Sequence, residues 1–322
     1  MTAASRPSGP LRTAVVGAGY LGRFHAQKYA GLPGVRLAAV VDADPETARK
    51  VGAELDVPAL TDFREILDEV DAVSLAVPTP QHYVIGAELL QRGIHLLVEK
   101  PIAATIPEAR ALVAIARRRG CVLQVGHLER FNPAVLAAAS CLGAARFIEA
   151  SRLAPYQRRG SDVSVVLDLL IHDIDLIQEL VARPVESVDA IGASVFSGEI
   201  DIVNARLRFE GGCVANTTAS RVSLKQERKL RIFQDDAYLS IDLHQKILTV
   251  VRKKDDAPVE SPAQVAIEEE SFAQGDALLA EIAAFVGAIR TGTEPIVTGE
   301  HGLRALETAM RITELVQRST AR

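Results

Sequence analysis

Between residues 11 and 125 the chain alternates short, uninterrupted apolar runs with longer amphipathic stretches. The expected strands are Leu11–Val16, Val35–Val41, Ala72–Val77, Ile94–Val98 and Val122–Val125, and the expected helices are Tyr20–Ala30, Pro45–Leu55, Asp62–Glu69, Tyr83–Arg92 and Ile106–Arg119. Strands that are apolar on both faces are typical of a parallel sheet with helices on each side. This pattern predicts a doubly wound α/β domain, a Rossmann fold, over residues 1–126.

The pattern changes after Gly126. One long helix is expected over Val163–Val181, and two more near Gly275–Arg290 and Glu300–Arg318. The expected strands are Val185–Val195, Asp201–Phe209, Cys213–Val222, Leu230–Phe233, Tyr238–Leu243 and Ile247–Val251, and Lys253–Glu270 is expected to be an exposed connection. Successive strands joined by short turns form antiparallel sheets. Residues 127–322 are therefore predicted to form an α+β domain with a mainly antiparallel, open sheet.

A glycine-rich segment, Gly17–Gly22, directly follows the first expected strand and opens the first helix. In a dinucleotide-binding turn the first glycine allows the tight turn, the second lets a pyrophosphate approach the backbone, and the third lets helix and strand pack closely. Asp42 ends the second strand about 20 residues later, where an acidic side chain accepts hydrogen bonds from the adenosine ribose and repels a 2′-phosphate. We expect NAD rather than NADP; a purely structural turn with a surface aspartate is the alternative.

Lys100 stands directly after the strand Ile94–Val98, within Glu99–Pro101. Ligands of doubly wound sheets bind at the carboxyl ends of the strands, so this lysine is placed at the expected site. A desolvated lysine can exchange a proton with a substrate hydroxyl, which arginine cannot do. The alternative is an ordinary surface lysine at a strand end.

Asp168 and His172 lie four residues apart on the long expected helix, and Asp175 extends the same polar stripe. The spacing puts these side chains on one face of the helix. Because their neighbours are apolar, we expect this face to line a cleft. Histidine can take a hydroxyl proton near neutral pH while a carboxylate orients it. Two alternatives stay open: a core histidine satisfied by its own aspartate, and a metal pair with His127 or Glu129 as a further ligand.

Several arginines could hold an anionic substrate. Arg130 lies at the passage between the two expected domains, where ligand sites are common. Upstream of the Asp168 helix stand Arg152, Tyr156, Arg158 and Arg159. Bidentate guanidinium groups suit phosphates, but ordinary surface arginines would give the same pattern.

Composition excludes some classes of partner. The net charge is −5, and basic and acidic residues are mixed along the chain, so no nucleic-acid-binding surface is predicted. No apolar run has the length of a membrane span, and the first residues lack the apolar core of a secretion signal. Cys121, Cys141 and Cys213 have no metal-ligand spacing and fit reduced thiols. We expect a cytoplasmic protein.

Taken together, these residues resemble the Gfo/Idh/MocA family, the relatives of glucose–fructose oxidoreductase and inositol dehydrogenase. The resemblance covers nearly the whole chain. It rests on Gly17–Gly22, Val77–Pro80 with His82, Glu99–Pro101, Asp168 with His172, and the C-terminal stretch Pro295–Ala309. One departure concerns Val165–Leu167, where family members often have glycines, so the start of that helix is expected to differ.

The resemblance implies an NAD-dependent oxidoreductase that converts a ring hydroxyl of a sugar to a ketone. Lys100 and His172 would be the catalytic pair, with either one as the base and Asp168 in support. The implied cofactor-binding residues are Gly17, Gly19, Tyr20, Leu21, Gly22, Asp42, Val77, Thr79, His82, Glu99 and Lys100. The implied substrate-binding residues are Lys100, Arg130, Tyr156, Arg159, Asp168 and His172. No metal is expected, and a homodimer or homotetramer formed through the open sheet is implied.

Two stretches, Gly19–Tyr29 and Gly126–Pro133, are similar to a narrower group of the family. That group acts on C3 of a nucleotide sugar, UDP-N-acetylglucosamine, for lipid A synthesis. Two alternatives remain for the whole chain. One is an NAD-dependent dehydrogenase of inositol or a non-nucleotide sugar, and the other is a dinucleotide-binding regulator without catalysis.

Overall fold

The computed structural model describes residues 9–157, 163–255, 259–272 and 274–320. The chain divides into two compact units. The first contains residues 1–128 and 277–304, and the second contains residues 129–276 and 305–322. The boundary expected at residue 126 lies close to the first change of unit. The return of residues 277–304 to the first unit was not predicted from the sequence.

The sheet of the first unit has six parallel strands in the order β3-β2-β1-β4-β5-β6. The strands are β1 (Leu11–Val16), β2 (Val35–Val41), β3 (Ala59–Leu60), β4 (Ala72–Leu75), β5 (His95–Glu99) and β6 (Leu123–Gly126). The chain reverses its direction of travel across the sheet between β1 and β4, as in doubly wound folds. The prediction of a Rossmann domain is confirmed.

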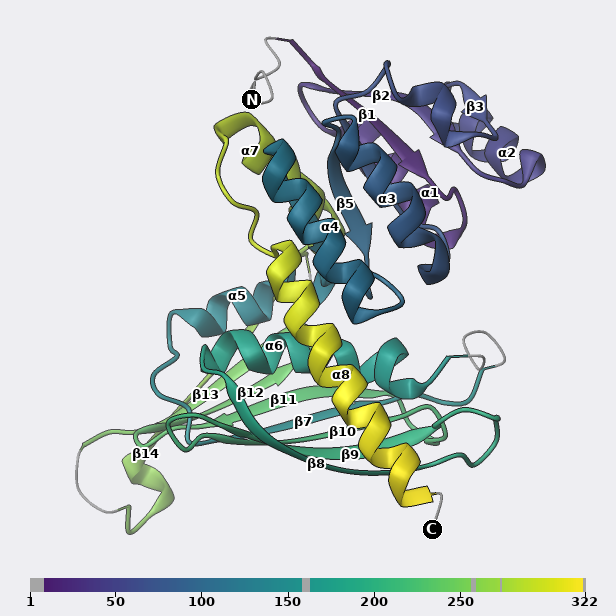
Figure 1. Ribbon diagram of the computed structural model, residues 1–322. Coiled ribbons are helices and arrows are strands. Elements are labelled where there is room, and N and C mark those ends of the chain that lie inside the picture. The colour runs from purple at the N-terminus through teal and green to yellow at the C-terminus, as the bar shows by residue number, and fades with distance from the viewer. Residues whose placement is uncertain (1–8, 158–162, 256–258, 273, 321–322) are drawn as a thin grey trace. The chain divides into compact units, whose positions relative to one another are not determined.

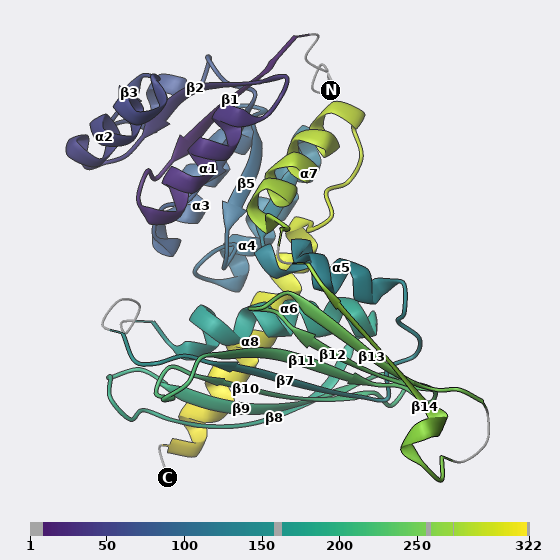
Figure 2. The ribbon, with the colours of Figure 1, turned by 180° about the vertical axis from the view of Figure 1, so that it is seen from behind.

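Helices cover both faces of this sheet. They are α1 (Tyr20–Gly31), α2 (Pro45–Leu55), α3 (His82–Gln91), α4 (Ile106–Arg119) and α7 (Ala277–Thr291). Figure 1 shows α3 and α4 in front of one face, and Figure 2 shows α1 and α7 in front of the other. Tyr29 of α1 and Phe285 of α7 are fully buried in one core with Leu11 of β1. The late segment α7 is thus an integral part of the first unit.

One helix expected in the first unit is wrong. Asp62–Glu69 forms only a single 3-10 turn, Phe63–Ile66, which the Asp62 side chain caps by accepting from the Arg64 N–H. The chain must enter β4 at Ala72, and Asp71 just before it is held by the guanidinium of Arg12 at 2.7 Å. The segment between this turn and β4 therefore ends at a fixed point.

The second unit is built on an eight-stranded sheet in the order β14-β13-β12-β11-β7-β10-β9-β8. The strands are β7 (Phe147–Leu153), β8 (Val185–Ala193), β9 (Ile202–Phe209), β10 (Val214–Ser220), β11 (Glu227–Phe233), β12 (Ala237–Asp242), β13 (Ile247–Lys253) and β14 (Val265–Ser271). Only the pair of β7 and β10 is parallel. The predicted mainly antiparallel sheet is confirmed.

Two strands of this sheet were not expected. β7 is central, but its alternation of apolar residues with Glu149 and Arg152 gives no continuous apolar run. β14 falls inside the expected connection Lys253–Glu270; it pairs only with β13, and most of its residues are exposed. An edge strand of this kind resembles an acidic loop in sequence, because it buries little apolar surface.

Helices pack on one face of the second sheet. They are α5 (Pro133–Ala139), a π-helical turn (Val166–Leu170), α6 (Ile171–Val181) and the part of α8 (Gly299–Thr320) that follows residue 304. Ile174 of α6 and Ile312 of α8 share a core with Leu207 of β9. Along β9 buried and exposed residues alternate, so the described part of the chain leaves the opposite face of this strand uncovered. Among the described residues, no helix combines the length and apolar character that crossing a bilayer requires.

Candidate functional site

In the glycine turn after β1, two glycines are required by the fold and one leaves space for a ligand. Gly17 has φ of +90°, and a Cβ there would lie 2.6 Å from the Ala76 backbone. A Cβ on Gly22 would collide with the Gly17 carbonyl, whereas one on Gly19 would meet nothing within 4 Å. The protein itself thus requires Gly17 and Gly22. Gly19 leaves open space at the start of α1, where a pyrophosphate needs room.

The start of α1 suits an anion. Gly19 is the N-cap and offers no side-chain oxygen, and the first turn has no acidic residue. Tyr20 is 63% exposed and Leu21 is 42% exposed, so this end of the helix lies at the surface. A helix start with these properties favours a phosphate through its N–H groups and its dipole. The residues of the turn therefore fit the pyrophosphate of a dinucleotide.

Asp42, at the end of β2, is tied to this turn. One carboxylate oxygen accepts from the Ala18 N–H at 2.7 Å, and the other accepts from the Asp44 N–H at 2.9 Å. A carboxylate has about four acceptor positions, so two remain for ribose hydroxyls. A pocket of about 250 Å³ adjoins the turn and is lined by Ala18, Gly19, Tyr20, Arg23, Phe24, Thr47, Lys50 and Val51. The expected contact with ribose stays a prediction that this geometry permits.

His82 joins the two loops expected to border the nicotinamide. Its ring is 1% exposed, with Nδ1 at 2.9 Å from the Pro101 carbonyl and Nε2 at 2.9 Å from the Val77 carbonyl. Burial lowers the pKa of His82, although both carbonyls oppose this. A neutral ring donates to only one carbonyl at a time. His82 is thus placed to position Val77 and Thr79, which leaves these two as the better candidates for cofactor contact.

Glu99 and Lys100 stand at the carboxyl end of β5, as expected, and the Lys100–Pro101 peptide bond is cis. Glu99 is nearly buried, with Oε1 at 3.0 Å from Nε2 of His25. Burial by itself would raise the pKa of Glu99, but the His25 hydrogen bond and the Lys100 charge bring it below its ordinary value. Glu99 is therefore an internal counter-charge, and its contact with the cofactor stays a prediction.

Asp168 and His172 lie on a helix that differs from the expected one. Val166–Leu170 is a π-helical turn, in which the Ile171 N–H reaches the Val166 carbonyl, and regular α-helix begins at Ile171. Ser164 begins the helix: its carbonyl accepts from the Asp168 N–H at 3.0 Å. Both candidate side chains are half-buried. Single π turns inside helices occur often at functional sites, which agrees with the predicted role of this pair.

Asp175 does not extend that stripe into a cleft. It is buried and lies 3.0 Å from Nε of Arg130, whose Nη1 is 2.8 Å from Glu179. The guanidinium of Arg130 is itself 6% exposed. Two carboxylates already balance this charge, so a substrate phosphate would have to compete with them. Arg130 is therefore the weakest of the predicted substrate ligands.

Arg152 is likewise an internal residue. It forms a bidentate pair with Asp173, the shortest bond being 2.7 Å, and contacts Glu129 at 2.9 Å. Burial opposes its charge, yet the two carboxylates raise the pKa of Arg152 above its ordinary value. These contacts do not favour the hypothesis that Arg152 holds a phosphate, which stays a prediction. Glu129, considered as a third metal ligand, is used in the same network.

The remaining predicted substrate ligands lie in one segment. Tyr156 is 40% exposed and packs edge-on against Phe196, with ring centroids 5.4 Å apart. Arg158 and Arg159 lie outside the described residues. Tyr156 is thus accessible to a ligand, and its role stays a prediction.

Sequence reasoning missed two residues behind Lys100. His25 of α1 bonds to Glu99, and Glu281 of α7 lies so near that one ligand atom from each of the three falls within 4.8 Å of the others. His25 lies in the stretch Gly19–Tyr29, whose pattern indicates a family resemblance but no chemical role for this histidine. Glu281 gave a signal that was overlooked, since it is a lone acid in an apolar helix.

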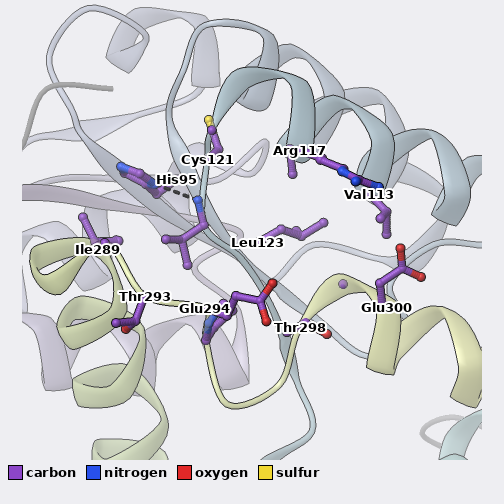
Figure 3. Close-up of a pocket in the computed structure, with 16 residues that line it drawn as sticks. His95, Val113, Arg117, Cys121, Leu123, Ile289, Thr293, Glu294, Thr298 and Glu300 are labelled. Carbon is purple, nitrogen blue, oxygen red and sulfur yellow. Dashed lines mark hydrogen bonds between the residues drawn. The ribbon is translucent and has the colours of Figure 1, made fainter. Parts of the chain in front are cut away.

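A pocket of about 640 Å³ lies at the amino-terminal ends of β5 and β6 (Figure 3). His95 and Leu123, which begin β5 and β6, line it, whereas Lys100 follows the opposite end of β5. The Nδ1 atom of His95 accepts from the Val122 N–H at 2.9 Å. None of the predicted site residues lines this pocket, so its size does not make it the candidate site.

Comparison with known proteins agrees with this geometry. Residues 11–127 match a family described as "Oxidoreductase family, NAD-binding Rossmann fold", and residues 154–321 match its "C-terminal alpha/beta domain". The chain is 38% identical over 308 residues to UDP-N-acetylglucosamine 3-dehydrogenase of Acidithiobacillus ferrooxidans, covering 95% of this chain and 97% of that protein. A solved structure of that enzyme has a TM-score of 0.92 and covers 97% of this chain and 99% of the other. The NAD-dependent scyllo-inositol 2-dehydrogenase of Bacillus subtilis is 25% identical, covering 89% of each.

Proposed function

This chain belongs to the Gfo/Idh/MocA family of NAD-dependent oxidoreductases, and from that premise we propose that it oxidises C3 of UDP-N-acetylglucosamine to a ketone. The observation that carries the proposal is the 38% identity to a UDP-N-acetylglucosamine 3-dehydrogenase, which extends over both domains. Weaker likeness to inositol dehydrogenases supports the reaction class but not this substrate. Fold by itself does not fix a substrate, so the nucleotide sugar must be tested directly.

In this reaction the C3–H bond breaks with its electron pair, the O–H proton leaves, and a C=O bond forms. Bound NAD⁺ supplies the hydride acceptor. The protein's part is to orient the sugar and take up the proton. We assign the proton to Lys100 or His172, either of which can accept it as a neutral base, and Asp168 to the support of His172. Glu99 supplies a fixed negative charge next to Lys100, which stabilises the ammonium that forms if lysine is the base.

Recognition of the nucleotide diphosphate falls to the segment that contains Tyr156 and Arg159. The internal ion pairs of Arg130 and Arg152 support this choice, because their guanidinium groups already have carboxylate partners. We further propose that the enzyme works in the cytoplasm as a homodimer or homotetramer. The uncovered face of the eight-stranded sheet supports an assembly, since large sheet faces seldom remain bare.

The test is to incubate the purified protein with NAD⁺ and UDP-N-acetylglucosamine, beside UDP-glucose, free sugars and inositols. NADH is followed by absorbance, and products are checked by mass spectrometry for the loss of two hydrogens, because alcohol oxidation can stop at low conversion. NADH formation with the N-acetylated UDP-sugar alone supports the proposal. Turnover of an inositol or free sugar, without response to any nucleotide sugar, overturns the substrate and keeps the family.

A further inference from the structure

A fully buried carboxyl group lies behind the Lys100 segment and has no part in the reaction described above. Glu281 of α7 is 0% exposed, and neither of its carboxyl oxygens has a hydrogen-bond partner among the described residues. Its backbone carbonyl accepts from the Gln124 side chain at 3.0 Å, which fixes this turn of the helix against β6. A buried, unpartnered carboxyl group destabilises the fold, so its presence calls for a reason.

Glu281 lies in a cluster with a second carboxyl group, that of Glu99, and with the ring of His25. One ligand atom each from Glu281, Glu99 and His25 lies within 4.8 Å of the other two. Gly126 makes room for this arrangement, since a Cβ there would come within 3.0 Å of the Glu99 carboxyl group. Two buried carboxylates at such a distance do not readily both ionise, so a shared proton, or a cation close to both, is expected.

A chain of hydrogen bonds that ends at Glu99 favours the ionised form of Glu99 over that of Glu281. The Tyr29 hydroxyl lies 2.8 Å from Oγ of Ser74, Oγ lies 3.2 Å from Nδ1 of His25, and Nε2 of His25 lies 3.0 Å from Glu99. Tyr29 is fully buried and keeps its proton, because burial raises its pKa. If Tyr29 donates to Ser74 and Ser74 to Nδ1, then Nε2 carries the hydrogen that Glu99 accepts. Every donor then has an acceptor, and Glu99 ends the chain as the anion.

Glu281 stands in the opposite situation. Glu99 has the His25 donor and the neighbouring Lys100 charge, and Glu281 has neither. Burial, followed by the charge of Glu99, raises the pKa of Glu281 well above its ordinary value. The titratable groups that face it are Glu99 from β5 with Lys100 beyond it, and His25 and Tyr29 from α1. A neutral acid at Glu281 can also donate to Glu99.

We propose that Glu281 is a positioning residue of the Lys100 site, held as a neutral carboxylic acid that shares its proton with Glu99, so that the pair carries one negative charge. Glu99 is then held by His25 on one side and by Glu281 on the other. Its charge stays constant while Lys100 exchanges a proton with substrate. The role in turnover rests on the proposed function, but the protonation state does not.

The first test is infrared difference spectroscopy of the full-length protein with NADH bound, at neutral pH. The Glu281→Gln protein should lack a C=O band of a buried protonated carboxyl that the wild-type protein has. Glu294→Gln removes an exposed acid of the same unit and should leave that band in place. Elemental analysis of the purified protein covers the other possibility. Identical spectra, or a stoichiometric metal that a chelator removes, would overturn the proposal.

The second test separates positioning from mere packing. Glu281→Leu removes the donor, and we expect kcat to fall about tenfold, the effect of one lost hydrogen bond. Glu281→Gln keeps a neutral donor, so its kcat should lie above that of the leucine variant. If ionisation of Glu281 lowers the kcat of the wild-type protein at alkaline pH, the glutamine variant should not show that decline. Thermal unfolding and NADH binding confirm that each variant is folded. Equal kcat and equal pH profiles in both variants would refute positioning. If no nucleotide sugar is oxidised, the proposed function fails and the infrared result still decides the state of Glu281.

Discussion

Asp201 in the second unit and Glu281 in the first are both 0% exposed, yet their surroundings are opposite. Asp201 accepts the backbone N–H groups of Val195, Phe196 and Ser197 and the Ser197 hydroxyl, and it lies 3.3 Å from Nε of Arg221. Despite burial, these donors lower the pKa of Asp201 to about 2. Glu281 has no such donor among the described residues, and its pKa is raised.

The difference shows how donors, and not burial alone, set the charge of an internal carboxyl group. In the second unit the buried carboxylates of Asp201 and Asp173 are saturated with donors: Asp201 fixes a loop, and the Asp173–Arg152 pair ties α6 to β7. Burial still raises the pKa of Asp173. Such groups hold a shape. In the first unit the Glu281 carboxyl group has no donor among the described residues, so burial and the charge of Glu99 raise its pKa. Four substitutions test this difference between the two units.

The largest effect is expected at Lys100. Lys100→Met removes the candidate base next to Glu99, and we expect turnover to fall about 10³-fold or more, the range of general acid–base catalysis. NADH affinity should change little, because the glycine turn and Asp42 are intact. Steady-state kinetics and fluorescence titration with NADH give the two numbers. Full activity would remove Lys100 from the mechanism.

The next effect concerns the saturated charges of the second unit. Arg152→Met leaves Asp173 and Glu129 buried without their partner, and we expect a loss of about 3–5 kcal/mol in the free energy of unfolding. Arg146→Met is the matched control, because Arg146 pairs with Asp235 at the surface and its loss should cost far less than that of Arg152. Urea unfolding measures both. Similar losses in the two variants would contradict the structural role given to the buried pair.

Asp201→Asn should cost less and depend on pH. The folded pKa of about 2 lies below the ordinary value of 3.8, so ionised Asp201 stabilises the fold above about pH 4, and this contribution fades as pH falls toward 2. We expect a difference of about 2 kcal/mol at pH 7 that shrinks between pH 4 and pH 2. Unfolding curves across that range test it. A difference that stays constant with pH would mean that geometry, not charge, accounts for the effect.

Glu281→Gln should give the smallest effect, and with the opposite sign. A raised folded pKa makes the wild-type fold lose stability as pH rises above the ordinary value near 4.5, because only the unfolded chain then ionises freely. Glutamine removes this loss, so the variant should be more stable at pH 8 by less than about 2 kcal/mol, with little gain at pH 5. Thermal unfolding at both pH values is sufficient. A variant that is less stable at pH 8 would show that the carboxylate has a partner.

The sequence predicted every strand of the first sheet except the two-residue strand β3, and the places of Gly17–Gly22, Asp42 and Lys100. These depend on local patterns: apolar runs, glycine spacing and strand ends. It failed where the outcome depends on distant segments. Glu99 and Glu281 meet through α7, which follows residues 129–276 of the second unit. Arg152 reads as a surface arginine until Asp173 is known to face it. The π turn at Val166–Leu170 gave no pattern, because it differs from an α-helix only in its hydrogen bonds.

The late return of α7 has a consequence for how the protein is made. Ribosomal synthesis proceeds from the N-terminus, so α1 and the strands of the first sheet exist long before residues 277–304 leave the ribosome. Until then the surface of α1 and β1 that Phe285 and Ile289 cover remains open to water, and a nascent chain stopped at residue 128 would expose it permanently. The NAD-binding unit therefore stays incomplete while residues 129–276 are made, and the second unit is completed only when residues 305–322 follow.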